Sequence, residues 1–487
     1  MKKILISTLL ATILLATNQG AYAQAVLPKK ITETKKAQVK DSIVKIFTIT
    51  SQPDFNSPWS SNISGGTGSG FIIDEDKILT NAHVVTNATY IEVLKNGEIK
   101  RYEAEVLSID HEADLALITV KNKKFFKNTK SLELGELPSL QDKIQVYGFP
   151  MGGETLSVTE GVVSRVENRN YVHSGKSLLA IQVDASINPG NSGGPAILNG
   201  KVVGLVMQGM PNGENLGYMI PTSIIKHYLK DMKDGKYDGF PFLGIMVQGL
   251  ESPVMKDKYG LKGKNYGILI NKTIPNSPAS RVLKTGDILT AIDGQRVYSN
   301  LKVEFRKKEF TDFKYALNKH QLKDKINLTI LRDNQEKNVS IVLDRKNDEL
   351  TLIKRQKHET KPSYFIYGGL VFVPGIEEHM YCSSYAKYDS IYPDRKRREL
   401  VLLKKVLPSS LTKGLDKYGI DIVDSVNGKK FKDFKEFVTI LKNSKEKFTV
   451  FEDENHVQMI LNHDDVLKRQ KDVLKKYNIK SYKSDNL

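Results

Sequence analysis

The segment Asn-Pro-Gly-Asn-Ser-Gly-Gly-Pro, residues 188–195, holds the residue types that nucleophilic catalysis needs. Glycines flank Ser192 closely, and they permit a tight turn and close approach of a substrate. The backbone N–H groups of Gly190 and Ser192 are candidates for an oxyanion hole, which stabilises charge that develops on a substrate carbonyl. A serine hydroxyl alone is a weak nucleophile, so this chemistry also requires a base and an acid that orients the base.

His83 and Asp114 are the candidates for those two roles. His83 lies within the segment Leu79–Val85, at the end of an apolar strand, and Asp114 directly precedes the apolar run Leu115–Ile118. A carboxylate that enters an apolar strand is costly unless it is paired, and a histidine N–H would pair it. Each residue alone has an ordinary interpretation, as a turn, a structural histidine or a cap. The three together, in the order His, Asp, Ser, predict a catalytic triad.

Between Asp41 and about His227, short β-rich runs alternate with Gly, Pro, Asn and Asp, which predicts an all-β sandwich or barrel. The clearest predicted strands are 42–46, 70–73, 143–147 and 201–206. A short helix is predicted at 222–232, and the Gly-, Lys- and Asp-rich stretch 234–240 is typical of a linker.

Two related modules are expected beyond that linker. The motif Gly286–Gly294 (GDILTAIDG) has a weaker echo at Gly419–Gly428, and helix candidates follow, such as 433–441. The modules span 241–344 and about 361–455, and 464–477 is a Lys-rich terminal helix candidate.

The first 23 residues have the pattern of a secretory signal peptide. A positive start is followed by an uncharged apolar run from Ile4 to Ala16, and Ala21-Tyr22-Ala23 matches a small-residue cleavage site. An uncleaved anchor is the alternative. No later segment has 18 uncharged apolar residues, so we expect no stable membrane span. The chain is therefore predicted to be exported, to the periplasm or, as the alternative, by full secretion.

The composition limits the number of domains and the kinds of site and partner that the chain can have. A length of 487 residues suggests about three domains, and one cysteine, Cys382, excludes an internal disulfide framework and a cysteine-based zinc site. The net charge of +17 suits nucleic acid or an anionic surface, yet no long Arg/Lys block is present, so solvated lysines explain it better. We expect no nucleic-acid partner. No metal-ligand cluster is evident, and His111, His173 and His227 are expected to be structural or solvated.

Four motifs together resemble the HtrA/Deg family of serine endopeptidases. They are TGSGF at 67–71, TNAHVV at 80–85, DLA at 114–116 and GNSGGP at 190–195. The resemblance implies a mainly β fold, with a chymotrypsin-like double β-barrel followed by two PDZ-like α+β domains. The second module departs from the usual pattern at Tyr367–Phe372 and, with its C-terminal ending, is similar to plant-type Deg proteases. Peptide binding by that module is therefore in question.

The implied organisation has six parts. They are a signal peptide (1–23), a flexible lead (24–40), the protease domain (41–235), a first PDZ domain (239–345), a divergent second PDZ-like domain (361–460), and a terminal helix and tail (461–487).

The resemblance also implies where substrates bind. Ser186, six residues before the nucleophile, takes the base of the primary specificity (S1) pocket, and apolar walls come from Ile187, Val206 and Met207. Because Ser186 is not an acid, cleavage after small or medium aliphatic residues is expected, with weak discrimination. The first PDZ domain is expected to capture C-terminal peptides, with backbone N–H groups holding the carboxylate. The loop concerned is Phe242-Leu243-Gly244-Ile245.

The expected function is ATP-independent degradation of misfolded or unfolded proteins in envelope quality control and stress response. No cofactor is expected, and the family implies a homo-oligomer, a trimer or a multiple of trimers, in which Phe55 and Trp59 are candidate contacts unless they form a local core. Segment 167–176, with Arg165 and Arg169, is a candidate relay to a PDZ domain. The alternatives are a mostly latent PDZ-bearing chaperone or scaffold and a dedicated processing protease with few native targets.

Overall fold

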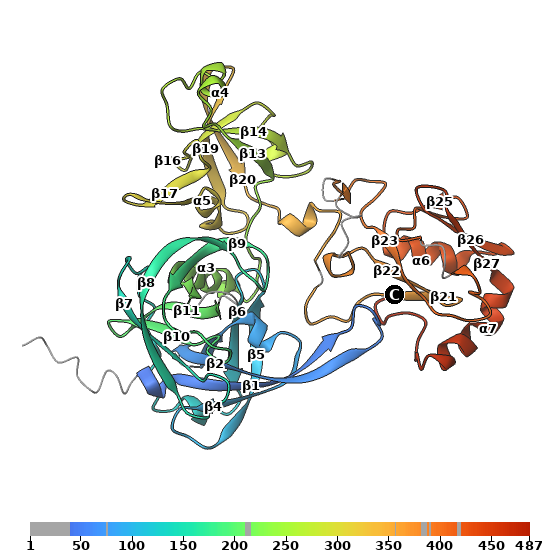
Figure 1. Cartoon of the computed structure of the whole chain (residues 1–487), viewed down its shortest axis with the longest axis horizontal. Coiled ribbons are helices and arrows are strands. Elements are labelled where there is room, and N and C mark those ends of the chain that lie inside the picture. Colours follow the sequence, from blue (N-terminus) through green and yellow to red (C-terminus); the bar gives the residue numbers. More distant parts are fainter. Residues whose placement is uncertain are drawn as a thin grey trace, which may run out of the picture.

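The computed structural model describes residues 39–74, 76–209, 216–355, 357–380, 387–388, 391–415 and 420–487. The predicted signal peptide, nearly all of the lead and Cys382 lie outside these ranges. Figure 1 shows two barrels packed side by side and two smaller sheet-containing modules.

The first barrel is closed by six antiparallel strands in the order β1-β2-β3-β6-β5-β4. Apolar side chains such as Val44, Ile46 and Ile118 fill its interior. The one-turn helix α2 (Ala82–Val85) follows β3. The strands are β1 (Ile43–Pro53), β2 (Ser61–Asp74), β3 (Lys77–Thr80), β4 (Ala88–Lys95), β5 (Arg101–Asp110) and β6 (Leu115–Val120).

The second barrel has the same closed six-strand form, in the order β10-β11-β12-β9-β8-β7. The amphipathic helix α3 (Thr222–Asp231) follows it and buries Ile224 and Ile225. The strands are β7 (Lys143–Gly148), β8 (Ser157–Asn170), β9 (Ser177–Val183), β10 (Pro195–Leu198), β11 (Lys201–Gly209) and β12 (Gly217–Pro221). Two closed barrels confirm the predicted double-barrel fold class.

The first module after the barrels is a sheet ordered β13-β14-β15-β19-β20, with β16 paired to β15 and a separate β17-β18 hairpin. Its helices are α4 (Pro253–Lys258) and α5 (Lys314–Asn318). The motif GDILTAIDG forms β15 and its turn. The strands are β13 (Ile245–Gly249), β14 (Ile268–Thr273), β15 (Ile288–Ile292), β16 (Gln295–Arg296), β17 (Lys302–Arg306), β18 (Glu309–Asp312), β19 (Lys325–Arg332) and β20 (Gln335–Val342).

The second module has a three-stranded sheet, β21-β22-β23, and a four-stranded sheet, β25-β24-β26-β27. Helices α6 (Phe434–Asn443) and α7 (His463–Lys476) correspond to the two helices predicted there. The strands are β21 (Phe365–Tyr367), β22 (Leu370–Pro374), β23 (Val401–Val406), β24 (Ser425–Val426), β25 (Lys429–Lys430), β26 (Phe448–Glu452) and β27 (Gln458–Asn462).

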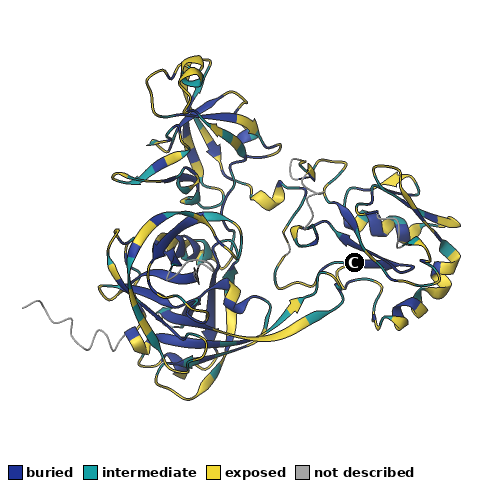
Figure 2. Cartoon of the chain, viewed as in Figure 1, coloured by how far each residue is buried: buried dark blue, intermediate teal, exposed yellow. Residues whose placement is uncertain are grey.

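The outer part of the β1–β2 hairpin, residues 49–65, forms an arm that leaves the first barrel and reaches the second module (Figure 1). Figure 2 shows that most of the arm is exposed or half-buried, whereas the barrel interiors are buried. At its tip Trp59 packs edge-on against Tyr364, with 5.9 Å between ring centroids. Trp59 therefore has a partner within the same chain, as the local-core interpretation predicted. Among the described residues, no helix is both long and apolar enough to cross a membrane.

Candidate active site

His83 and Asp114 are brought together by the pairing of β3 with β6. Thr80 lies opposite Ala116, so the end of β3 and the start of β6 coincide. His83 follows that end within helix α2, and Asp114 precedes β6. Asp114 has a left-handed backbone, with φ of 55°, which turns its side chain at a point where aspartate is tolerated.

The Asp114 carboxylate is buried and fully used as an acceptor. Its side chain is 1% exposed, and its two oxygens lie 2.8 and 3.0 Å from His83 Nδ1. The His83 backbone N–H donates to it at 2.9 Å, and Asn81 Nδ2 donates at 3.2 Å. Because a carboxylate only accepts, Nδ1 carries the proton and Nε2 keeps its lone pair. This is the tautomer that a general base requires.

The pKa of His83 is raised above its ordinary value. Burial lowers it, but the negative charge and the hydrogen bond of Asp114 outweigh burial. The imidazolium form is therefore stabilised in place, while 35% of the side chain remains exposed toward solvent.

Ser192 lies in a turn between β9 and β10 whose conformation requires glycine at three neighbouring positions, Gly190, Gly193 and Gly194. Gly193 has φ of +85°, and a Cβ there would lie 2.1 Å from the Ser69 carbonyl oxygen. At Gly194 a Cβ would lie 2.0 Å from the Tyr147 carbonyl oxygen, and at Gly190, with φ of +96°, 2.4 Å from that of Phe149. The glycines thus let the turn pack directly against neighbouring backbone.

Ser69 of β2 fastens this turn to the first barrel. Its hydroxyl donates to the Gly190 carbonyl at 2.7 Å and accepts from the Phe149 N–H at 2.8 Å. Its backbone N–H donates to the Ser192 carbonyl at 2.8 Å. The sequence analysis assigned Ser69 no role, although it lies in the TGSGF motif. The TGSGF motif could have indicated this role, because the hydroxyl of a buried serine needs a hydrogen-bond partner.

One cleft between the barrels is lined by both His83 and Ser192. The other lining residues include the β1–β2 residues Phe47, Thr48, Ile49 and Gly65, together with Met151, Pro189 and Gly190. The Ser192 hydroxyl donates to the Met207 carbonyl at 3.3 Å. Within the described part of the chain, the N–H groups of Gly190 and Ser192 have no hydrogen-bonded acceptor. Both are thus free for a ligand oxygen.

The structure places the four predicted S1 residues in different environments. Val206 and Met207 are buried in β11, directly behind the turn that holds Ser192, since the Gly193 N–H donates to the Val206 carbonyl at 3.0 Å. Ile187 is half-buried and packs toward the second barrel core, whereas Ser186 is exposed. The four residues are not part of the lining of the cleft that holds His83 and Ser192.

The predicted carboxylate-binding loop lines a pocket at the protease surface. Phe242, Leu243, Gly244 and Ile245 line it together with Phe313 and Leu317. Charged residues of both signs complete the lining, with Lys176 paired to Glu112 and Arg355 to Glu377. Within the described ranges, the N–H groups of Leu243 and Gly244 donate to no backbone acceptor. Gly244 has φ of +82°, which leaves this turn open to an incoming oxygen.

Strand β8 contacts the first module through a residue that the sequence analysis did not single out. The Asn168 N–H donates to Thr311 Oγ1 at 3.0 Å, and Thr311 Oγ1 donates to Asn168 Oδ1 at 3.2 Å. Arg165 instead pairs with Glu167, and the Arg169 guanidinium lies over the Tyr218 ring. The contact expected of Arg165 and Arg169 is therefore made by Asn168.

The structure also assembles three histidines that the sequence left apart. The ring nitrogens of His111, His173 and His358 lie within 4.8 Å of one another. Burial lowers the pKa of His173, and burial beside the other two rings lowers the pKa of His358 to about 4. His227 behaves as expected of a structural residue, since it donates to the His320 carbonyl at 2.9 Å and stacks on Phe240.

Three family models match the chain. A model described as a trypsin-like peptidase domain matches residues 68–205, and two described as PDZ domains match residues 241–343 and 353–486.

Curated relatives extend the match over most of the chain. Protease Do-like 4, mitochondrial, of Arabidopsis thaliana is 40% identical over 370 residues, which cover 74% of this chain and 70% of that protein. Protease Do-like 2, chloroplastic, from the same plant is 34% identical over 475 residues, or 93% of this chain and 77% of that protein. The chain belongs to the HtrA/Deg family. It is a serine endopeptidase with two PDZ domains, as the four motifs predicted.

Among solved structures, the fold of this HtrA/Deg protease is similar to that of an HtrA-type protease AlgW with tripeptide. The TM-score is 0.50 at 24% identity, with 63% of this chain and 95% of the other covered. The module at 241–344 is accordingly called PDZ1 below, and the module from residue 361 through helix α7 and the tail is called PDZ2.

Proposed function

We propose that this endopeptidase is exported and degrades unfolded or misfolded proteins without ATP, with Ser192 as nucleophile, His83 as general base and Asp114 as the residue that orients His83. The observation that carries this proposal is the cleft that holds both His83 and Ser192, with Asp114 fixed on His83 Nδ1 at 2.8 Å.

Acylation begins when the Ser192 hydroxyl turns from the Met207 carbonyl to His83 Nε2. Nε2 accepts the proton as Ser192 Oγ attacks the scissile carbonyl, and Asp114 stabilises the imidazolium that forms. His83 then gives this proton to the amine that leaves as the peptide bond breaks, and a water molecule activated by His83 releases the acyl group from Ser192. The N–H groups of Gly190 and Ser192 hold the oxyanion. The reaction uses no cofactor, and it requires neutral His83. Turnover should therefore fall as the pH drops through the raised pKa of His83.

The expected specificity rests on the four predicted S1 residues, none of which is an acid. Ser186 offers no charge partner to a basic side chain, and the apolar neighbours Ile187, Val206 and Met207 favour small or medium aliphatic residues. An apolar pocket separates side chains by about 1–3 kcal/mol per methylene, so cleavage should be broad. Unfolded chains meet this requirement because their aliphatic residues are exposed.

PDZ1 supplies a second contact to substrates. The N–H groups of Leu243 and Gly244, which donate to no backbone acceptor among the described residues, suit a C-terminal carboxylate. Lys176 and Arg355 lie in the same pocket, paired with Glu112 and Glu377. The same pocket is lined by Gly175 and Lys176 of the segment between β8 and β9. Peptide capture can thus act on the segment that follows Asn168. We also propose a homo-oligomer, either a trimer or a multiple of trimers, on the family resemblance, and a location in the periplasm on the leader at 1–23.

The decisive experiment is digestion of a permanently unfolded protein by the purified chain and by Ser192→Ala. Loss of one triad member should lower turnover by about 10⁴–10⁶-fold. The matched control is Ser139→Ala, because Ser139 is exposed and its side chain lies outside the cleft. Equal cutting by all three proteins would reject Ser192 as the nucleophile.

A latent, mainly chaperone-like protein is the second candidate, and one observation favours it. The Ser192 hydroxyl is bonded to the Met207 carbonyl and is not directed at His83. A latent enzyme would digest the unfolded protein only after a peptide with a free C-terminal carboxylate is added. Digestion without added peptide would instead support the degradative function.

A further inference from the structure

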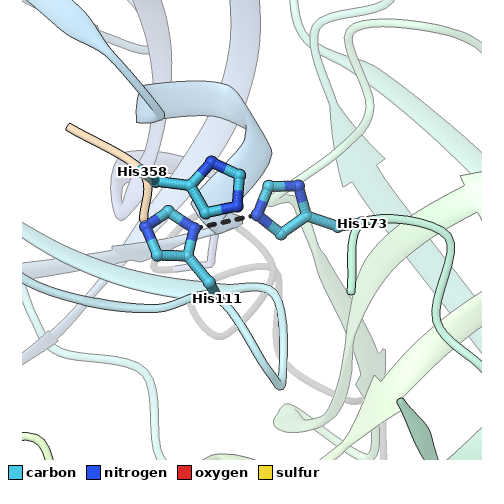
Figure 3. A group of neighbouring side chains, drawn as sticks. All are labelled: His111, His173 and His358. Carbon is cyan, nitrogen blue, oxygen red and sulfur yellow. Dashed lines mark hydrogen bonds between the residues drawn. The ribbon is translucent and has the colours of Figure 1, made fainter. Parts of the chain in front are cut away.

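Three histidines from three distant segments meet beside the catalytic residues. His111 lies in the turn between β5 and β6, His173 lies between β8 and β9, and His358 lies in the segment that joins PDZ1 to PDZ2. Figure 3 shows one ring nitrogen of each turned toward the same small space. Among the described residues, this is the one group of three His, Cys, Asp or Glu side chains whose ligand atoms converge in this way.

The spacing of the nitrogens is close to that of a metal centre. His173 Nε2 donates a hydrogen bond to His111 Nδ1 at 2.9 Å, and its proton must leave Nε2 before both nitrogens bind one ion. The His358 ring stacks on both rings at centroid distances of 3.9 and 5.1 Å. With metal–nitrogen bonds of about 2.0–2.1 Å in a tetrahedron, two ligand nitrogens lie about 3.3 Å apart. The three nitrogens lie within 4.8 Å of one another, so the rings must draw together when an ion binds.

A carboxylate already orients the first of these ligands. His111 Nε2 lies 2.9 Å from Glu359 Oε2, so Nε2 carries the proton and Nδ1 presents its lone pair to the cluster. Glu359 is itself held by Asn87, whose N–H donates to Oε1 at 3.2 Å while its Oδ1 accepts from the Glu359 N–H at 2.8 Å. Carboxylate–histidine pairs of this kind support metal-binding histidines in many proteins.

We propose that His111, His173 and His358 bind one divalent transition-metal ion, of the class that prefers imidazole ligands and is represented by Zn²⁺. Three neutral imidazoles and an open fourth position match the ligands of such ions, and hard cations such as Mg²⁺ or Ca²⁺ prefer oxygen. The bound ion fastens the segment before PDZ2 to the two protease turns.

The bound ion also lowers endopeptidase turnover, and this consequence rests on the proposed function. The His173 and His83 rings are 6.3 Å apart, and His111 precedes Asp114 by three residues. A dication at this distance opposes the positive charge that His83 acquires during acylation. Zn²⁺ should therefore inhibit at least about tenfold, and removal of Zn²⁺ should restore turnover.

The binding test uses the Ser192→Ala chain, purified without a histidine tag, and does not depend on activity. Titration with Co²⁺ should give the visible absorption of a tetrahedral site at one ion per chain, and Zn²⁺ should displace it. His173→Gln and His358→Gln should each abolish that spectrum. Glu359→Gln should weaken binding by about 10–100-fold. His456→Gln is the matched control, since the His456 side chain is 84% exposed and lies in PDZ2, and it should bind like the parent.

His358→Cys is the control that separates loss of a metal ligand from failure of a variant to fold. It keeps a ligand, so it should bind Co²⁺ and add a sulfur-to-metal charge-transfer band that the parent chain lacks. Absence of a tetrahedral spectrum in the parent, or an unchanged spectrum in His173→Gln and His358→Gln, would overturn the site. Zn²⁺ inhibition of the wild-type enzyme that persists in His358→Gln would overturn its regulatory consequence. An inactive wild type would reject the proposed function and leave the binding result standing.

Discussion

The two PDZ domains differ in what lies beside the strand that follows their glycine-containing loop, which includes Gly244 in PDZ1 and Gly368 and Gly369 in PDZ2. In PDZ1 that strand is β13, which lies at the edge of its sheet and, among the described residues, pairs with β14 alone. In PDZ2 it is β22, which follows Gly368 and Gly369 and lies between β21 and β23. A peptide that binds by strand addition needs a free edge. PDZ1 offers one, and in PDZ2 the chain's own β21 occupies it.

The loops before these strands differ in the hydrogen bonding of their backbone N–H groups. The Leu243 and Gly244 N–H groups in PDZ1 are free of backbone acceptors, whereas in PDZ2 the Gly368 N–H donates to Gln470 Oε1 at 2.8 Å. The C-terminal residues then extend the covered side, because the Ile366 N–H donates to the Tyr482 carbonyl at 2.6 Å. PDZ1 thus leaves this strand edge open, whereas PDZ2 closes the corresponding edge with its own chain.

The largest expected difference between the domains concerns a buried charge. Asp287 of PDZ1 is 1% exposed and is held by Arg332 at 2.6 and 2.7 Å, whereas the corresponding Asp421 of PDZ2 is exposed. Arg332→Met should destabilise PDZ1 by about 3–5 kcal/mol because the carboxylate loses its charge partner. Hydrogen exchange of β15 and β19 amides would measure this. Asp421→Asn should change PDZ2 by less than about 0.5 kcal/mol, and equal losses would contradict the comparison.

Truncation after Lys480 tests whether the tail closes PDZ2 without blocking a peptide site. The cut removes the bond to the Tyr482 carbonyl and two bonds between Ser484 and Tyr364. At about 1 kcal/mol per hydrogen bond, PDZ2 should lose about 2–3 kcal/mol, read from hydrogen exchange of β21 and β22. Peptide affinity of the chain should not change, because β21 still covers β22. New peptide binding would show that the tail itself had filled a functional groove.

A glycine exchange in each loop should separate the two domains by affinity. A Cβ at Gly244 would lie 2.2 Å from the Ser277 Cβ, and φ is +82°. Gly244→Ala should therefore weaken binding of a C-terminal peptide by about tenfold or more, since the loop must shift at a cost of about 1–3 kcal/mol. Calorimetry in the Ser192→Ala background would measure it, with an amidated peptide as the ligand control. Gly369→Ala should leave this affinity as it was; a drop there would assign the binding to PDZ2.

The smallest effect concerns helix capping. In PDZ2 the Asp433 carboxylate accepts from the Glu436 N–H at 2.9 Å at the start of α6, whereas α5 of PDZ1 has no such side-chain cap. Asp433→Ala should destabilise PDZ2 by about 1 kcal/mol. Hydrogen exchange across α6 is the measurement, and Lys435→Ala is the control on the exposed face. A loss in the control as large as in Asp433→Ala would show that propensity, and not capping, is being measured.

The sequence predicted those parts of the protein that depend on local pattern. The β-rich runs at 42–46 and 143–147 correspond to the barrel strands β1 and β7, because such runs bounded by turn residues favour strands. Asp114 could be paired with His83 because a carboxylate that enters an apolar strand demands a donor. The glycines beside Ser192 predicted a tight turn, and the structure shows why no side chain fits there: a Cβ would collide with the Ser69 or Tyr147 carbonyl oxygen.

What the sequence did not reveal depends on contacts between distant segments. His111 and His358 are 247 positions apart, and no periodicity links them. Ser69 acts through the turn of the other barrel, and Asn168 through a threonine of PDZ1. The pairing of β21 with β22 decides whether PDZ2 has a free edge, yet a three-residue strand leaves almost no hydrophobic pattern.

The arm that joins the first barrel to PDZ2 has an optical consequence. Trp59 at its tip is the chain's single tryptophan, so all indole fluorescence of the protein comes from the contact with Tyr364 and its surroundings. Separation of the arm from PDZ2 would expose the ring to water and shift its emission to longer wavelength. The unlabelled protein thus contains a built-in spectroscopic reporter of the seating of PDZ2 against the protease, readable while peptide or metal is added.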